Sequence, residues 1–151
     1  MMGTTHAFYD AYKEARTRLA LVIQELSPED LSKKLLPGEN SIGFLLRHIG
    51  DVELLFAKNV FRLEGVEVKA QTVIDKLDTG IWTNLEELIY YLEYSFQTVL
   101  SAVAQQTDDS WDELVETKEF GTKSKAEAFG RIISHTAYHS GQLAMIRKYG
   151  R

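Results

Sequence analysis

The chain has 151 residues, 44% of them hydrophobic, with no cysteine, a formal net charge of −5 and a pI near 5.4. This length suits one domain over residues 1–151, and the missing cysteines exclude disulfides, a cysteine nucleophile and a thiolate metal site. The acidic balance argues against binding nucleic acid through its phosphates, and no apolar run approaches the roughly 18 residues of a membrane span. We therefore expect a soluble, cytoplasmic protein.

The first third of the sequence predicts one long helix and one short helix. Apolar residues recur at helical spacing over residues 4–26. The stretch "SPED" that follows is typical of a new helix start, with Ser27 as the N-cap and Pro28 as the first helical residue. The cluster "PGEN" at 37–40 then predicts a turn.

A second long helix is expected to begin at Asn40 or Ser41 and to extend to about Leu63. Its apolar residues keep one face over this whole stretch, and Gly65 is the residue expected to end it. Residues 65–82 form a long connection with weak periodicity.

The remaining two helices both begin with the spacing of a capping box. Thr83 and Glu86 mark the start of a helix that ends near residue 106, and Ser124 and Glu127 mark one that runs to about residue 149. The acidic segment between them is expected to be a short hairpin or a loop. Four helices of roughly 20 residues with long connections predict an all-α, four-helix bundle with crossover loops.

Three of the four histidines fall on inward faces of these helices. His135 and His139 are one turn apart, with Cβ atoms about 5–6 Å apart, and His48 lies in the apolar stripe of the second long helix. Three imidazoles from two helices can hold a divalent ion and leave a coordination position open. His6 is expected at the surface. Thr136 stands where a zincin peptidase has its glutamate, which excludes that class.

The same histidines have a simpler interpretation, because core histidines often pack as ordinary hydrogen-bonded side chains. The pair on the last helix does not separate the two interpretations, and His48 on a distant helix favours the metal site. Gln142 and Asp51 are the candidates for catalysis or for orienting a ligand, since each follows a histidine by three residues. A solvated helix face is the ordinary expectation for Asp51 and for Glu53.

Two tyrosines of the third long helix lie off its main apolar stripe. Tyr91 and Tyr94 form a second aromatic face, which is typical of a dimer interface or of a substrate pocket. We expect the dimer interface.

Two stretches together resemble the DinB/YfiT-like superfamily of metalloenzymes, which is unrelated to the DNA polymerase of similar name. They are "NSIGFLLRHIGDVELL" (40–55) and "ISHTAYHSGQLAMIRKYG" (133–150). The resemblance covers essentially the whole chain and implies a four-helix bundle, often dimeric, with zinc or nickel held by three histidines. On this chain those ligands are His48, His135 and His139, and Gly141 with Gln142 matches the family's G-Q pair.

The chain departs from the family pattern beside the last ligand. Many members have a histidine and an arginine where this chain has Tyr138 and Ser140, so the roles of those neighbours do not carry over. Characterised relatives include thiol-dependent S-transferases and isomerases that use bacillithiol or mycothiol. The resemblance thus implies a small-molecule substrate and a low-molecular-weight thiol. A metal-dependent hydrolase, a non-catalytic metal-binding dimeric bundle and a structural bundle with core histidines remain the alternatives.

Overall fold

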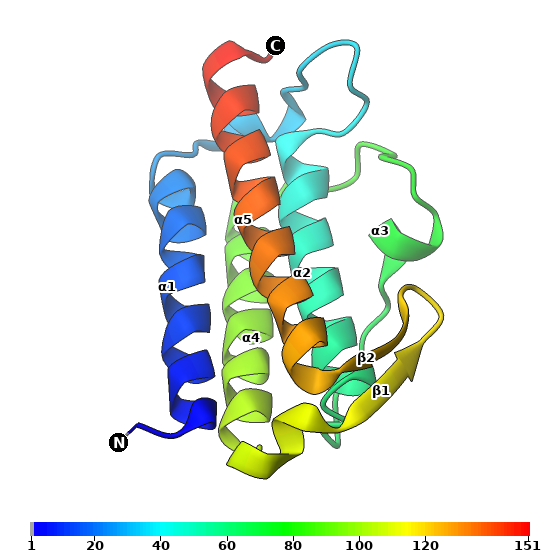
Figure 1. Ribbon diagram of the computed structural model, residues 1–151. Helices are drawn as coiled ribbons and strands as arrows, with labels where there is room; N and C mark the ends of the chain where they lie inside the picture. The colour runs from blue at the N-terminus through cyan, green and yellow to red at the C-terminus, as the bar shows by residue number, and fades with distance from the viewer. Residues whose placement is uncertain (1) are drawn as a thin grey trace.

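The computed structural model describes residues 2–151 and contains four long helices that pack side by side (Figure 1). These helices are α1 (Thr4–Gln24), α2 (Ile42–Asn59), α4 (Leu85–Ala104) and α5 (Lys125–Tyr149). Both α1 and α2 contact α4 and α5, which closes the bundle. The predicted all-α four-helix bundle is therefore confirmed. Within residues 2–151, no helix combines the length and apolar character that crossing a bilayer requires.

Short elements occupy the connections. The 3₁₀ helix η1 (Pro28–Ser32) follows α1, and the single turn α3 (Gln71–Ile74) lies in the long connection between α2 and α4. The 3₁₀ helix η2 (Asp108–Asp112) leads into an antiparallel hairpin of β1 (Leu114–Thr117) and β2 (Gly121–Ser124) before α5. Figure 1 shows the hairpin at the end of the bundle where α5 begins. Of the two expectations for this acidic segment, the hairpin is the correct one.

Side-chain caps begin three of the four long helices, namely α2, α4 and α5. Ser124 Oγ accepts from the Glu127 N–H at 3.1 Å, and Glu127 returns a bond to the Ser124 N–H at 2.9 Å, so this capping box is confirmed. The capping box expected at Thr83 is wrong by one residue. The cap is Asn84, whose amide oxygen accepts from the Glu87 N–H at 3.2 Å, and asparagine is at least as good an N-cap as threonine.

The predicted end of the second long helix is also wrong. The helix ends at Asn59 rather than Leu63, and Gly65 does not terminate it. Arg62 adopts a left-handed backbone with φ of 53°, and the Leu63 N–H bonds back to the Ala57 carbonyl at 3.0 Å. The apolar spacing continues through this turn, so periodicity alone could not reveal where the helix stops.

The interior is divided along the bundle axis. At one end an apolar cluster rich in aromatic rings includes Tyr12, Trp111 and Phe129, and at the other end a mostly aliphatic cluster includes Leu19 and Leu143. On each long helix, buried polar residues lie in sequence between members of the two clusters. These residues are Arg16 on α1, Asp51 and Glu53 on α2, Ser95 on α4, and Thr136 and Ser140 on α5. The histidines of α2 and α5 fall in the same stretch of sequence, so a polar layer separates two apolar ends.

Two glycines of α2 allow neighbouring segments to approach it closely. A Cβ on Gly43 would collide with the Trp82 carbonyl, and a Cβ on Gly50 would lie 2.6 Å from Cε1 of Tyr91. Any larger residue at these positions would push away the connection before α4, or α4 itself. The close packing at Gly50 is what brings the Tyr91 hydroxyl to the polar layer.

Candidate metal centre

The structure brings together the three histidines that were predicted to form a site. His48 comes from α2, and His135 and His139 come from successive turns of α5. The His135 Nε2 atom lies 3.1 Å from Nε2 of His48 and 3.1 Å from Nε2 of His139. One nitrogen from each ring lies within 4.8 Å of the others, and all three side chains are partly buried. His6 lies elsewhere, exposed beside Asp10, as expected for a surface residue.

Hydrogen bonds fix the protonation of two of these rings. The His139 Nδ1–H donates to the Gln142 amide oxygen at 2.6 Å. Thr72 donates its hydroxyl to Asp51 at 2.7 Å, so the Thr72 oxygen accepts from Nδ1–H of His48 at 3.2 Å. With protons on Nδ1, both Nε2 atoms point lone pairs into the centre of the cluster.

The third ring has no such partner. Nδ1 of His135 is buried and has no hydrogen-bond partner among the described residues. A proton on that nitrogen leaves the N–H without an acceptor, and the Nε2 lone pair of His135 then faces those of His48 and His139, each 3.1 Å away. A proton on Nε2 instead satisfies only one neighbour. No arrangement of protons on neutral rings therefore pairs all three inward nitrogens, whereas a cation does.

The spacing of the nitrogens suits a bound divalent ion. Nitrogens about 2.0–2.1 Å from one metal, with bond angles of about 90–110°, lie about 2.9–3.4 Å apart. The separations of 3.1 Å from Nε2 of His135 to Nε2 of His48 and of His139 fall within that interval. The donor set and its geometry therefore fit the metal that the sequence predicts.

The electrostatic surroundings keep the imidazoles neutral. Burial lowers the pKa of His48 to about 4, with the nearby His139 adding to the effect and Asp51 opposing it. Burial, together with the neighbouring rings and Arg131, lowers the pKa of His135 to about 3. Burial also lowers the pKa of His139, although its bond to Gln142 acts in the other direction. Neutral rings are the form that binds metal, so the site needs no deprotonation at neutral pH.

Asp51 is a buried centre of hydrogen bonding and does not lie on a solvated helix face, so that expectation is wrong. Its carboxylate accepts from Arg47 Nε at 2.8 Å, from the Tyr91 hydroxyl at 2.6 Å, and from both the backbone and the hydroxyl of Thr72. The side chain is fully buried. Asp51 therefore orients His48 through Thr72 and not by direct contact.

Glu53 was also expected on a solvated face, and this expectation is wrong for the same reason. Its carboxylate accepts from the Ser95 hydroxyl at 2.6 Å and from the Thr136 hydroxyl at 3.2 Å, and it lies 3.6 Å from Nε of Arg16. Both charged side chains are buried. Glu53 thus ties together all four long helices, and it contacts α5 at the residue next to His135. The sequence pattern that could have indicated this burial is the presence of polar residues at inward positions of all four long helices.

The two positions that depart from the family pattern have different environments. Ser140 is buried and donates to the Thr136 carbonyl at 2.7 Å, so it belongs to the helix interior. Tyr138 is 64% exposed, its hydroxyl accepts from the Gln142 amide at 3.2 Å, and its ring meets His139 edge-on at 5.1 Å. Tyr138 is therefore part of the rim of the histidine cluster.

The two tyrosines of α4 are likewise separated by the fold. Tyr91 is half-buried, and its hydroxyl is bound to Asp51, while the Arg47 guanidinium lies 4.0 Å above its ring. Burial and the bond to Asp51 raise the pKa of Tyr91. Tyr94 remains exposed. Tyr91 therefore supports the interior of the site, and Tyr94 is the one of the pair available to a partner.

The cluster is accessible along the line where α2 and α5 meet. His135 lines a hollow of about 350 Å³ together with side chains from both helices and from the hairpin turn. Besides His135, its polar groups come from Arg131, Ser134, Tyr138 and Glu119. A small molecule can therefore approach the ring of His135 from outside the bundle.

The fold is a four-helix bundle, and three imidazoles converge from its second and last long helices. The protein is therefore a helical-bundle protein with a candidate three-histidine metal site. The model of the DinB superfamily matches residues 11–143, and the chain belongs to that superfamily. The resemblance noted in the sequence is thereby confirmed.

The crystal structure of a conserved protein from Enterococcus faecalis is similar over 98% of this chain and 97% of that chain, with a TM-score of 0.68. Its sequence identity is 14%, so it supports the fold alone. A search of curated proteins found no match.

Proposed function

We propose that this protein is a metal-dependent enzyme in which His48, His135 and His139 bind one divalent ion, zinc or nickel. We propose further that it transfers a low-molecular-weight thiol, of the bacillithiol type, to a small electrophilic molecule. The observation that carries the proposal is the pair of 3.1 Å separations between Nε2 atoms, with Nδ1 of two rings already committed to acceptors.

The chemistry follows from the charge of the donor set. Three neutral imidazoles leave the double charge of the ion uncompensated, so a bound ion would supply a Lewis acid strong enough to deprotonate a coordinated thiol. The chain's own residues hold the ligands in place. Gln142 orients His139, and Asp51 orients His48 through Thr72.

The state of the neighbouring carboxylates favours a thiol over water as the nucleophile. Hydrolysis commonly relies on a general base beside the metal. Asp51 and Glu53, the two carboxylates of α2 closest in sequence to His48, are both committed to several interior donors. A thiol that loses its proton on coordination does not need such a base. For this reason the thiol transferase is the first proposal, and a metal-dependent hydrolase is the alternative.

We propose that the protein acts as a homodimer, as the family resemblance implies. The exposed rings of Tyr90 and Tyr94 on α4 give the aromatic character that interfaces favour. The cytoplasmic location and the lack of nucleic-acid binding remain predictions from the sequence.

Metal content is the first test. Protein purified without an affinity tag should contain about one divalent ion per chain by elemental analysis. The variant His48→Ala should lose that ion, whereas His6→Ala, which removes the exposed histidine, should retain it. A metal-free wild-type protein would reject the metal site, and the remaining interpretation would be a structural bundle with core histidines. In that case, replacing His135 and His139 by leucine should stabilise the fold.

Turnover is the second test. The metal-loaded protein should consume a low-molecular-weight thiol in the presence of an electrophile, and His48→Ala should not. Stoichiometric metal without turnover over a broad panel of thiols and electrophiles would favour the non-catalytic metal-binding bundle. Hydrolysis without any thiol dependence would favour the hydrolase.

A further inference from the structure

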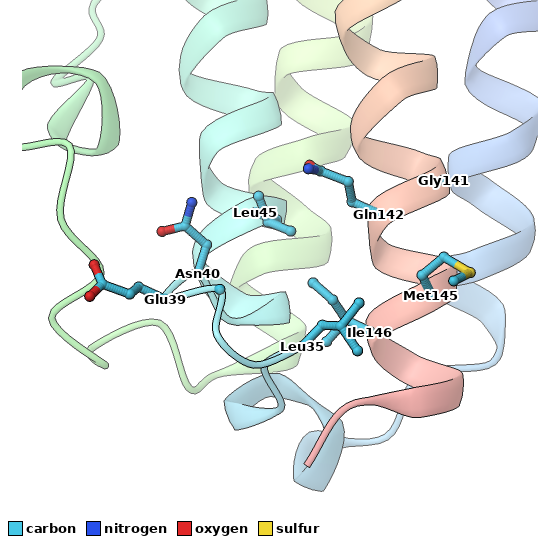
Figure 2. A pocket seen from close by; sticks show the side chains of 9 residues that line it. Leu35, Glu39, Asn40, Leu45, Gly141, Gln142, Met145 and Ile146 are labelled. Atoms are coloured by element: carbon cyan, nitrogen blue, oxygen red, sulfur yellow. The ribbon is translucent and has the colours of Figure 1, made fainter.

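A second cavity lies directly beside the histidine cluster. Its volume is about 540 Å³, within the range of about 300–1,000 Å³ typical of small-molecule sites. Figure 2 shows that its walls come from α2, from α5 and from the segment after η1. The side chains of Leu45 and Gln142 lie between the two helices, with Leu35 and Ile146 close together below them.

The lining of this cavity is mostly apolar and disfavours an anionic occupant. Leu35, Leu45, Met145 and Ile146 supply apolar surface, and no lysine or arginine lies among the lining residues. The amides of Asn40 and Gln142 are neutral hydrogen-bonding groups, and Glu39 extends away from them in Figure 2. An anionic group would find no countercharge here, and desolvating it would cost free energy, whereas an alkyl or aryl group would gain from burial.

One side chain joins this cavity to the histidine cluster. Gln142 lines the cavity, and its amide oxygen accepts from Nδ1–H of His139 at 2.6 Å. A molecule in the cavity therefore lies one residue away from a proposed metal ligand. The cavity wall also has open space at Gly141, where an added Cβ would meet no heavy atom within 4 Å apart from its chain neighbours and the nearby backbone of α5.

We propose that this cavity binds an uncharged alkyl or aryl group of the electrophilic substrate. The assignment rests on the proposed function, because the histidine cluster is where the reacting atoms would be held. The substrate class is thus an electrophile with an apolar, uncharged arm, not a charged metabolite. Gln142 would contact this arm on one side and keep His139 oriented on the other.

A neutral fluorescent probe tests the cavity without any catalytic readout. N-phenyl-1-naphthylamine should bind the wild-type protein with increased fluorescence, and 1-alkanols from butanol to octanol should displace it. Each added methylene should tighten alkanol binding by about three- to fourfold until the cavity is filled. Alkanoates of equal length should compete at least tenfold more weakly.

Two glycines of α5 provide a matched pair of variants. Gly141→Leu should fill the cavity and weaken probe binding at least tenfold. Gly130→Leu is the control, since Gly130 is also exposed, also has no heavy atom within 4 Å of an added Cβ, and does not line the cavity. Leucine is a better helix former than glycine, so both variants should fold at least as stably as the wild type.

The outcomes separate this proposal from the proposed function. Equal probe affinity in the wild type and in Gly141→Leu, or alkanol affinities that do not rise with chain length, would overturn the cavity assignment while stoichiometric metal still supported the metal site. A changed sedimentation coefficient in Gly141→Leu with unchanged probe binding would also overturn it, because the cavity would then face a second copy. If the wild-type protein contained no metal but still bound the probe more tightly than Gly141→Leu and bound alkanols more tightly than alkanoates, only the proposed metal chemistry would be rejected.

Discussion

The two halves of the histidine cluster are held in place by different means. His48 on α2 is oriented through Thr72 and Asp51, and Thr72 belongs to α3, the single turn in the connection between α2 and α4. His135 and His139 on α5 are aligned by helical spacing, and Gln142, three residues further on, orients the second of them. One half is assembled by the fold as a whole, and the other is nearly complete within a single helix.

This difference implies unequal rigidity. Asp51 receives donors from α2, α3 and α4, so His48 is fixed by three elements at once. His135 has no partner at Nδ1 among the described residues, and His139 has only Gln142. Ligands that several elements constrain hold their geometry best, so we infer that α2 sets the position of the site and that α5 adapts to it.

Removing Asp51 should produce the largest effect. We expect Asp51→Ala to lower the free energy of unfolding by about 3 kcal/mol, because the guanidinium of Arg47 and the hydroxyls of Tyr91 and Thr72 would lose their shared acceptor. The partial exposure of Arg47 keeps the value at the lower end of the range for a broken buried ion pair. Urea denaturation of the metal-free protein measures it.

The matched control for this variant is Asp75→Ala. Asp75 lies in the same connection as Thr72 but is exposed, so its replacement should change the free energy of unfolding by less than about 0.5 kcal/mol. Equal stabilities of the two variants would mean that the α2 half is no more firmly held than the surface.

The hydroxyl of Thr72 is the link between Asp51 and the candidate ligand. We expect Thr72→Val, which keeps the shape of the side chain, to weaken metal binding about 10–100-fold because Nδ1–H of His48 loses its acceptor. Calorimetric titration with zinc measures the change. Thr17→Val, on the exposed face of α1, should leave the affinity unchanged. An unaltered affinity in Thr72→Val would show that His48 does not depend on the network.

The corresponding change on α5 should have a smaller effect. Gln142→Leu removes the acceptor of His139, but this position is only half-buried, so water can replace the amide oxygen. We expect about a tenfold loss of zinc affinity and a change in the free energy of unfolding below about 0.5 kcal/mol. Gln97→Leu on the exposed face of α4 is the control. A larger loss in Gln142→Leu than in Thr72→Val would reverse the ranking of the two halves.

The same contrast explains what the sequence could and could not predict. The α5 half was predictable because helical spacing alone brings His135 and His139 onto one face. The burial of Asp51 was not predictable, because it is covered by Thr72 from a connection without periodicity and by Tyr91, which approaches only because Gly50 has no side chain. The spacing of residues along the sequence predicts which side chains share a helix face, but it does not predict which loop covers that face.

Glu53 teaches a related lesson about charged residues. A glutamate in a helix was expected to face solvent, yet it is buried against Arg16, Ser95 and Thr136 from the three other long helices. Its burial costs little only because these partners meet it at one level of the bundle. That coincidence depends on the relative positions of four helices, which no single stretch of the sequence specifies.

The smallest effect that we expect is the response of metal affinity to mild acid. Burial holds the pKa of His48 at about 4 and that of His135 at about 3, so both rings remain neutral well below the ordinary histidine value of about 6.5. Zinc affinity should therefore change less than threefold between about pH 7.5 and about pH 6, where ordinary histidines already take up protons. Calorimetric titration across this interval measures it, and a tenfold loss would show that the rings are more open to solvent than the structure implies.

The free energy of unfolding should depend on pH more strongly than zinc affinity does. The unfolded chain takes up protons on these histidines as the pH falls below about 6.5, but the folded metal-free chain does so only near pH 4 for His48 and near pH 3 for His135. The free energy of unfolding should therefore be greatest above pH 6.5 and should fall as the pH is lowered toward 4. The variant that replaces both His48 and His135 by leucine should lose part of this slope. If the slope is unchanged in that variant, other groups cause the acid sensitivity.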